Sequence, residues 1–270
     1  MLKPKKSSLK TNLLIFIAGL MIQACDFTPP INKEILSAQE LIKENAYEEA
    51  VKSYFKILKK NPNNDVRVKI NYQIGDLYSI YLSDIEESLS YYEEVIKIAF
   101  DQRWKQKAQQ RLADLYLNHL KDNVKAENLY RDLLNAESDE KNKALYRYRI
   151  ALANYNDFDF NKAKPIFEKL SKENFGGYTL KSFYYLGMIE FYKENWKAAI
   201  RYLEMYVKRE NKREELIQAK FILANALESR ENLNKAYDLY YSILPEYPNT
   251  QVIKDKLKAI YNRRLARKRN

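Results

Sequence analysis

The chain has 270 residues with only 5 Gly and 7 Pro, and this scarcity of turn residues favours helices over a β-sandwich. One His and one Cys exclude an internal disulfide and a metal cluster built from His and Cys. Four lysines in residues 1–24 and an excess of seven basic residues in 254–270 account for the formal charge of +11, so the body between them is neutral and is not expected to bind nucleic acid.

The first predicted element is a secretory signal over residues 1–24. A lysine-rich leader precedes the ten apolar residues "LLIFIAGLMI", which occupy residues 13–22. This run is too short to cross a bilayer as a helix, which takes about 20 residues. A charged leader, a short apolar run and a small residue before the cleavage point are the parts of a signal that is removed.

The sole cysteine, Cys25, lies directly after this signal. The segment "IQAC", Ile22 to Cys25, resembles a bacterial lipobox, although Gln23 departs from the usual small residue. The resemblance implies cleavage before Cys25, a diacylglycerol on its thiol and acylation of the new N-terminus, with chains such as palmitate. Two or three chains anchor a protein stably, since each buried CH₂ contributes about 0.8 kcal/mol. The alternative is a cysteine that closes a hydrophobic helix.

Residues 25–33 are expected to form the lipidated cysteine and a short linker. Pro29 and Pro30 favour an extended chain there. With a linker this short, the folded part would lie close to the membrane. These features place the protein in the cell envelope, facing the periplasm, with the outer membrane favoured over the inner.

Residues 34–248 contain six copies of one helical pattern, with apolar residues at i, i+3, i+4 and i+7. Small residues recur at spacings of 38, 38, 37, 36 and 37, at Ala50, Ser88, Ala126, Ala163, Ala199 and Ala236. A second set lies 12 or 13 residues upstream, at Ala38, Gly75, Ala113, Ala151, Gly187 and Ala224. Small residues at both places let two antiparallel helices approach closely. Large residues would fill the space against the neighbouring pair, at Tyr54, Tyr92, Tyr130, Phe167, Leu203 and Tyr240.

This pattern resembles the tetratricopeptide repeat (TPR). The sixth copy matches best, with Ala224, Leu233, Ala236, Tyr240 and Pro248 at the spacing of the family, while copies two and three carry one extra residue between their helices. The resemblance implies an all-α fold, a right-handed α-solenoid of six TPR-like helix pairs.

Residues 249–270 are expected to form a basic C-terminal capping helix. Ile253, Leu257, Ile260 and Tyr261 make one apolar stripe that would cover the last repeat. The charge near its end exceeds what capping needs, and it would bind anionic lipid or an acidic partner, or remain a solvated tail. This basic surface comprises Arg263, Arg264, Arg267, Lys268 and Arg269.

No catalytic motif is present. Carboxylate pairs such as Glu48/Glu49 lie among lysines on helix faces, and His119 has no partner residues for a metal or catalytic site. The sequence therefore predicts a non-enzymatic protein with no cofactor, no metal and no small-molecule substrate. A wall lytic enzyme is disfavoured, because only one helix follows the repeats.

In TPR arrays the first helix of each pair lines a groove. The positions that this resemblance implies for a partner-binding groove are Tyr72, Asp76, Tyr148, Leu152, Tyr155, Tyr184, Met188, Tyr192, Phe221 and Asn225. Aromatic side chains with few rotors suit peptide binding, whereas the alternative is that they pack between helices.

The expected function is a lipid-anchored scaffold for protein partners in the cell envelope. The architecture and the segment "YYSILPEYPNTQV" at 240–252 resemble the TPR lipoprotein subunit of the outer-membrane β-barrel assembly machinery. A coordinator of peptidoglycan synthesis or lipoprotein trafficking uses the same repeats and is the alternative.

Overall fold

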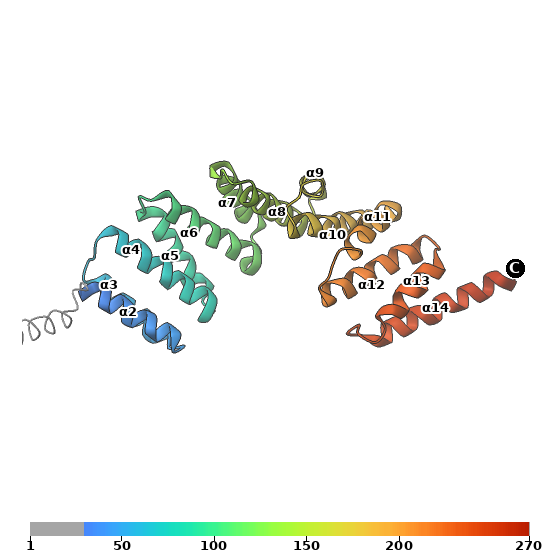
Figure 1. Ribbon diagram of the computed structural model, residues 1–270, viewed down its shortest axis with the longest axis horizontal. Coiled ribbons are helices and arrows are strands. Elements are labelled where there is room, and N and C mark those ends of the chain that lie inside the picture. The colour runs from blue at the N-terminus through green and yellow to red at the C-terminus, as the bar shows by residue number, and fades with distance from the viewer. Residues whose placement is uncertain (1–29, 270) are drawn as a thin grey trace, which may run out of the picture. The chain divides into compact units, whose positions relative to one another are not determined.

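The computed structural model describes residues 30–269, and within that range it contains thirteen α-helices and no strand. The helices fall into two compact units, and the chain passes from the first to the second between Ala99 and Phe100. Within each unit, consecutive helices pack against one another (Figure 1). The all-α, TPR-like architecture expected from the repeats is therefore confirmed.

Unit 1 contains two helix pairs. The first pair is α2 (Pro30–Lys43) with α3 (Tyr47–Lys59), and the second is α4 (Asn64–Asp76) with α5 (Ile85–Ile98). A π-helical segment, η1 (Leu77–Tyr81), extends α4.

Unit 2 contains four pairs and a final helix. The pairs are α6 (Gln102–Leu115) with α7 (Asn123–Ala136), α8 (Glu140–Asn156) with α9 (Phe160–Leu170), α10 (Gly177–Tyr192) with α11 (Trp196–Val207), and α12 (Arg213–Ser229) with α13 (Leu233–Ile243). A second π-helical segment, η2 (Tyr116–Leu120), extends α6, and α14 (Thr250–Arg269) follows the last pair. Together the two units give the six pairs that the sequence predicts.

The small residues of the repeat lie at the closest approach of paired helices. A β-carbon added to Gly75 would lie 2.8 Å from Cε1 of Tyr92, and one added to Gly187 would lie 2.7 Å from Cγ of Leu203. The six large residues of the second helices are all at most 1% exposed. Small and large positions therefore pack as the repeat pattern predicts.

The turn inside each pair has one residue with positive φ, and none of these residues is glycine. They are Asn45, Ser83, Lys121, Phe158, Glu194 and Glu231, with φ between 56° and 60°. In three of the turns an aspartate then caps the second helix, at Asp84, Asp122 and Asp159. A left-handed residue therefore reverses the chain in all six pairs.

The two π-helical segments occur in the two copies with one extra residue. The spacing between the small residues is 13 in copies two and three and 12 in the other four. In η1 the amide of Leu82 donates to the carbonyl of Leu77, five residues earlier. The extra residue is absorbed as a wider helical turn, so the tight turn after it is retained.

The N-terminal boundary differs from the prediction. Helix α2 begins at Pro30, four residues before the expected start of the repeats and inside the expected linker of 25–33. Proline at the first helical position is favourable, because its fixed φ suits the helix and its missing N–H would have no intrahelical partner. The predicted signal of 1–24 and Cys25 lie outside the described residues, so the predicted lipidation keeps the status of a prediction.

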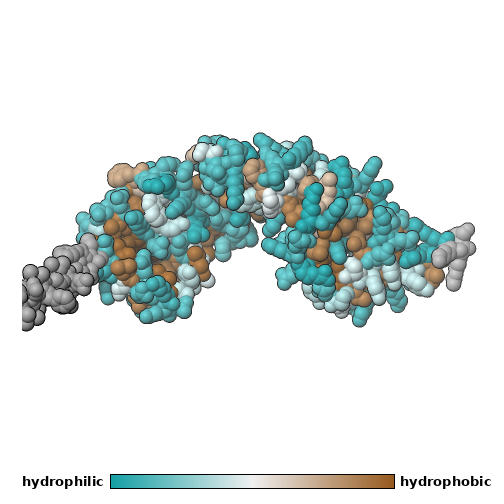
Figure 2. Space-filling view, in the orientation of Figure 1, coloured by the Kyte–Doolittle hydropathy of each residue, from teal (hydrophilic) through white to brown (hydrophobic). Residues whose placement is uncertain are grey.

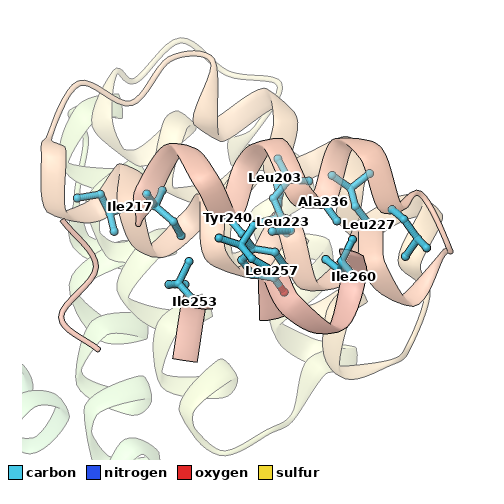
Figure 3. Close-up of a cluster of buried hydrophobic side chains, with 12 residues drawn as sticks. Leu203, Ile217, Leu223, Leu227, Ala236, Tyr240, Ile253, Leu257 and Ile260 are labelled. Atoms are coloured by element: carbon cyan, nitrogen blue, oxygen red, sulfur yellow. The ribbon is translucent and has the colours of Figure 1, made fainter. Parts of the chain in front are cut away.

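The C-terminal helix covers the last repeat with three residues of the predicted stripe. Ile253, Leu257 and Ile260 are 0%, 9% and 0% exposed, and they join Tyr240 in one apolar cluster (Figure 3). Tyr261 was expected in this stripe, but it is 53% exposed. Residue 261 is one position, about 100°, beyond Ile260 around the helix, which turns it out of the buried stripe.

The surface in the view of Figure 2 is largely hydrophilic in each unit, with patches of hydrophobic residues. Among the helices of residues 30–269, none combines the length and the apolar character that a bilayer crossing needs.

Candidate partner-binding site

An aromatic cluster in unit 2 centres on Tyr185 of α10. Its ring stacks on Phe167 at 5.1 Å between centroids and meets Tyr155 edge-on at 4.9 Å. Tyr148 and Tyr184 also contact it edge-on, at 6.1 and 5.4 Å. Each edge-to-face or stacked pair adds about 0.5–1.5 kcal/mol beyond burial, so the cluster is a rigid support.

The predicted groove residues of α8 contribute mainly to this packing. Tyr148 is only 6% exposed, and burial, together with neighbouring Tyr185, raises the pKa of its hydroxyl. Leu152 and Tyr155 are partly buried against the same apolar cluster. Tyr148, Leu152 and Tyr155 therefore contribute more to internal packing than to a surface that a partner could contact.

The predicted groove residues of α10 are more accessible. Tyr184 is half-buried and lines a pocket, while Met188 is half-buried. Tyr192 is 52% exposed and stacks on Phe160 at 5.6 Å. Of the predicted aromatic residues, Tyr192 is the most exposed and Tyr184 is the one that lines this pocket.

The predicted residues of α12 and of unit 1 make internal contacts. Phe221 stacks on Tyr247 at 4.7 Å, and the Asn225 amide donates to the Phe221 carbonyl at 2.8 Å. In unit 1, Asp76 accepts a 2.6 Å hydrogen bond from the Tyr92 hydroxyl. Tyr72 packs edge-on against the same tyrosine at 5.6 Å.

The pocket lined by Tyr184 lies between α10, the end of α11 and the start of α12. Its volume is about 420 Å³, and it is lined by Lys181, Tyr184, Tyr185, Tyr206, Glu214, Glu215 and Gln218. This volume is at the low end of the roughly 300–1,000 Å³ of small-ligand pockets, and it suits a single side chain of a partner.

Glu215 holds one side of this pocket in place. Its carboxylate accepts hydrogen bonds from the Tyr206 hydroxyl at 2.9 Å and from Lys212 at 3.1 Å, and Lys181 lies 4.0 Å away. Burial opposes its ionisation, but these hydrogen bonds and the nearby lysine charges outweigh burial and lower the pKa of the Glu215 carboxyl. Glu215 is therefore ionised at neutral pH and tied to its neighbours.

Sequence reasoning identified Tyr184 but missed Tyr185, Tyr206, Glu214 and Glu215. The groove pattern selects every third or fourth residue of a first helix, whereas Tyr185 is the next residue after a selected one. Tyr206 comes from the end of α11, and Glu214 and Glu215 come from the first turn of α12. The tandem "YY" at 184–185 and the acidic pair after Arg213 were the available signals.

A second pocket of about 490 Å³ lies by the loop between α9 and α10, and Arg209 stacks there over Phe183 at 5.1 Å. Thr179 in this pocket is already used, since its hydroxyl donates to the Glu173 carbonyl and accepts from the Phe175 amide. Because the Thr179 hydroxyl already stabilises the loop, this pocket is the weaker candidate for binding a partner.

The predicted basic surface is largely engaged within the chain. Arg263 pairs with both Glu228 and Glu231, and Arg267 pairs with Glu231. Arg264 lies over the Tyr237 ring at 5.4 Å. These contacts fasten α14 to α12 and to the turn before α13, which explains much of the basic excess. The side chains of Lys268 and Arg269 lie outside the described part.

No group of three or more His, Cys, Asp or Glu side chains among the described residues could hold a metal ion.

No protein-family model matches the sequence, and no curated protein matches it. Solved structures share the fold. The apo form of the quorum sensor NprR from B. thuringiensis aligns with a TM-score of 0.64 at 16% identity, over 93% of this chain and 74% of that one. NprR in complex with its cognate peptide NprX aligns with a TM-score of 0.51, at 16% identity, over 94% and 78%.

Two further structures cover similar shares of the chain. PilW, a type IV pilus biogenesis factor, has a TM-score of 0.58 at 13% identity, over 86% of this chain and 98% of that one. A tetratricopeptide repeat protein from Parabacteroides merdae has a TM-score of 0.52 at 16% identity, over 90% and 89%. At these identities the likeness shows a TPR-type helical repeat fold.

Proposed function

We propose that this protein is a non-enzymatic, lipid-anchored scaffold that holds a protein partner at the cell envelope. The TPR-type fold supports a binding role, and NprR, which shares this fold, is known in complex with a peptide. The predicted lipobox at Cys25 supports the anchor and the periplasmic location.

The observation that carries the binding role is the pocket between α10 and α12. Aromatic side chains with few rotors line it, and the ring contacts of Tyr185 with Tyr148, Tyr155 and Phe167 hold it rigid. A rigid aromatic pocket loses little conformational entropy when it binds, which favours recognition of a peptide or loop.

Within the envelope, the role that we propose first is an accessory subunit of outer-membrane β-barrel assembly. It rests on the predicted signal, the predicted lipidation of Cys25, the predicted short linker and the "YYSILPEYPNTQV" segment of the last repeat. Coordination of peptidoglycan synthesis is the second role, because the same architecture serves it.

Partner capture tests these roles. The protein is cross-linked in intact cells, extracted in mild detergent and isolated, and the attached proteins are identified by mass spectrometry. A β-barrel assembly protein as the main partner supports the first role, and a wall synthase or hydrolase supports the second. Recovery of the protein without any enriched partner would contradict the scaffold.

The anchor has a separate test. We expect the wild type to partition into the detergent phase and Cys25→Ala to accumulate as a larger, uncleaved precursor. The same mass and the same partitioning for both proteins would refute lipidation.

A further inference from the structure

We propose that the pocket between α10 and α12 receives an arginine side chain of the partner. This inference rests on the proposed function, which it deepens by naming the chemistry that the pocket recognises.

One carboxylate that lines the pocket has no ion-pair partner among the described residues. Glu215 is held by Tyr206, Lys212 and Lys181. Glu214 lines the same pocket, is exposed, and makes no ion pair among the described residues. The pocket therefore presents one spare carboxylate, which is complementary to a cation from outside.

The tyrosine rings at the pocket lie at steep angles to one another. Tyr184 lies 5.4 Å from Tyr185 with an 85° angle between their ring planes, and 5.2 Å from Tyr206 with a 53° angle. Centroids this close mean that the rings contact one another, and Tyr206 is only 2% exposed, so a group in the pocket would meet the half-buried Tyr184 ring. A cation over a tyrosine face is attracted by the ring quadrupole, more strongly where water is excluded.

Among cations, arginine suits this pocket best. A guanidinium is planar, stacks on aromatic rings and keeps donors at its edge for a carboxylate. Stacked against the Tyr184 ring, it can direct those donors to Glu214. An ammonium group is a compact, strongly hydrated charge and gains less from the flat walls.

Among the described residues that line the pocket, Lys181 is the one cation, and it opposes the incoming charge. Its Nζ lies 4.0 Å from Oε1 of Glu215, and its side chain is 43% exposed. Since Lys181 and Lys212 both face Glu215, they leave Glu214 free. Removal of Lys181 is therefore expected to strengthen arginine binding.

The test uses the full-length protein in detergent, with the tyrosine rings labelled for NMR. The probe is the blocked peptide acetyl-Gly-Arg-Gly-amide, compared with the same peptide carrying citrulline, which keeps the shape of arginine without its charge. We expect the arginine peptide to shift the ring signals of Tyr184 and Tyr206 and to bind at least about tenfold more tightly, which corresponds to about 1.4 kcal/mol.

Three variants locate the effect. Glu214→Gln is expected to reduce arginine binding about tenfold, and Lys181→Met to tighten it severalfold. Glu204→Gln makes the same charge change at an exposed position of α11 that does not line the pocket, and it is expected to bind as the wild type. Added salt should weaken binding to the wild type more than to Glu214→Gln.

Equal affinity for the arginine and citrulline peptides would overturn the inference, as would unchanged binding by Glu214→Gln. Capture of a cellular partner at this pocket without any arginine preference would remove the inference and leave the proposed function standing. Arginine binding without any captured partner would contradict the proposed scaffold function and leave the preference of the pocket for arginine standing.

Discussion

At the scale of single residues, the hydroxyls of two buried tyrosines account for an aspartate on the first helix of their pair. Tyr92 donates to Asp76, and Tyr130 donates to Asp114, each at 2.6 Å. In copies four and five the large residues are Phe167 and Leu203, which have no hydroxyl, and the positions equivalent to Asp76 are the apolar Leu152 and Met188. Several predicted groove positions thus follow the needs of packing.

Tyr54 and Tyr92 form a matched pair for testing this account within unit 1. The Tyr54 hydroxyl is buried and makes no hydrogen bond among the described residues. We expect Tyr92→Phe to cost about 1–3 kcal/mol of unfolding free energy, because it removes the donor to Asp76. Tyr54→Phe should be neutral or slightly stabilising. Urea unfolding of both variants measures the difference, and equal costs would contradict the account.

At the scale of helices and turns, the repeat pattern predicts some features and omits others. Spacing alone predicts all six helix pairs, because the small and large residues that define them must face each other. It does not predict the π-helical turns, since one extra residue could equally have lengthened a loop. The start of α2 at Pro30 was missed because two consecutive prolines were interpreted as an extended linker.

The π-helical turn of copy three can be tested by deletion. Removing exposed Asn118 shortens the spacing from Ala113 to Ala126 to the 12 residues of four other copies, so the fold should survive at modest cost. Removing exposed Ser229 from α12 shortens a spacing of 12 to 11 and rotates Ala224 by about 100° relative to Ala236. We expect this control to cost about 3 kcal/mol or more.

Thermal unfolding followed by circular dichroism compares the two deletions. A deletion of Asn118 as damaging as the deletion of Ser229 would show that the wide turn is required and is not merely tolerated.

The C-terminal helix can be tested through two neighbouring residues. Ile260 is fully buried, so Ile260→Ala should cost about 2–5 kcal/mol through lost burial and a cavity. Tyr261 is 53% exposed, and Tyr261→Ala should change the free energy of unfolding by no more than about 0.5 kcal/mol. Chemical denaturation measures both losses of unfolding free energy. A larger loss for Tyr261→Ala than for Ile260→Ala would show that Tyr261 belongs to the buried stripe.

For the whole molecule, the many buried tyrosines predict sensitivity to alkali. Burial above all, together with nearby acidic or tyrosine side chains, raises the pKa of the Tyr130, Tyr148 and Tyr240 hydroxyls above the ordinary value of 10.0. The unfolded chain loses these protons near pH 10, while the folded chain keeps them. Stability from these groups is therefore full below about pH 10 and falls as the pH rises further.

Denaturant unfolding at a series of pH values from neutral to strongly alkaline measures this loss. We expect a flat free energy of unfolding up to about pH 10 and a steep fall above it, accompanied by cooperative appearance of the tyrosinate absorbance. A free energy that stays constant through this range would contradict the burial of these hydroxyls.

The binding site was only partly predictable at this scale, for a physical reason. The pocket joins α10 to the end of α11 and the first turn of α12, so its chemistry depends on residues from two successive repeats. A pattern carried over position by position within one repeat finds Tyr184 and cannot find the Tyr206–Glu215 pair.

The measurement that tests the central claim most directly is site-specific photo-cross-linking in living cells. A photoreactive amino acid replaces Gln218, which is exposed and lines the pocket, or Tyr241, which is 63% exposed and does not line it. The account predicts a discrete partner adduct from position 218 that is absent from position 241 and is reduced by Glu214→Gln. No adduct from position 218, or the same adduct from both positions, would contradict it.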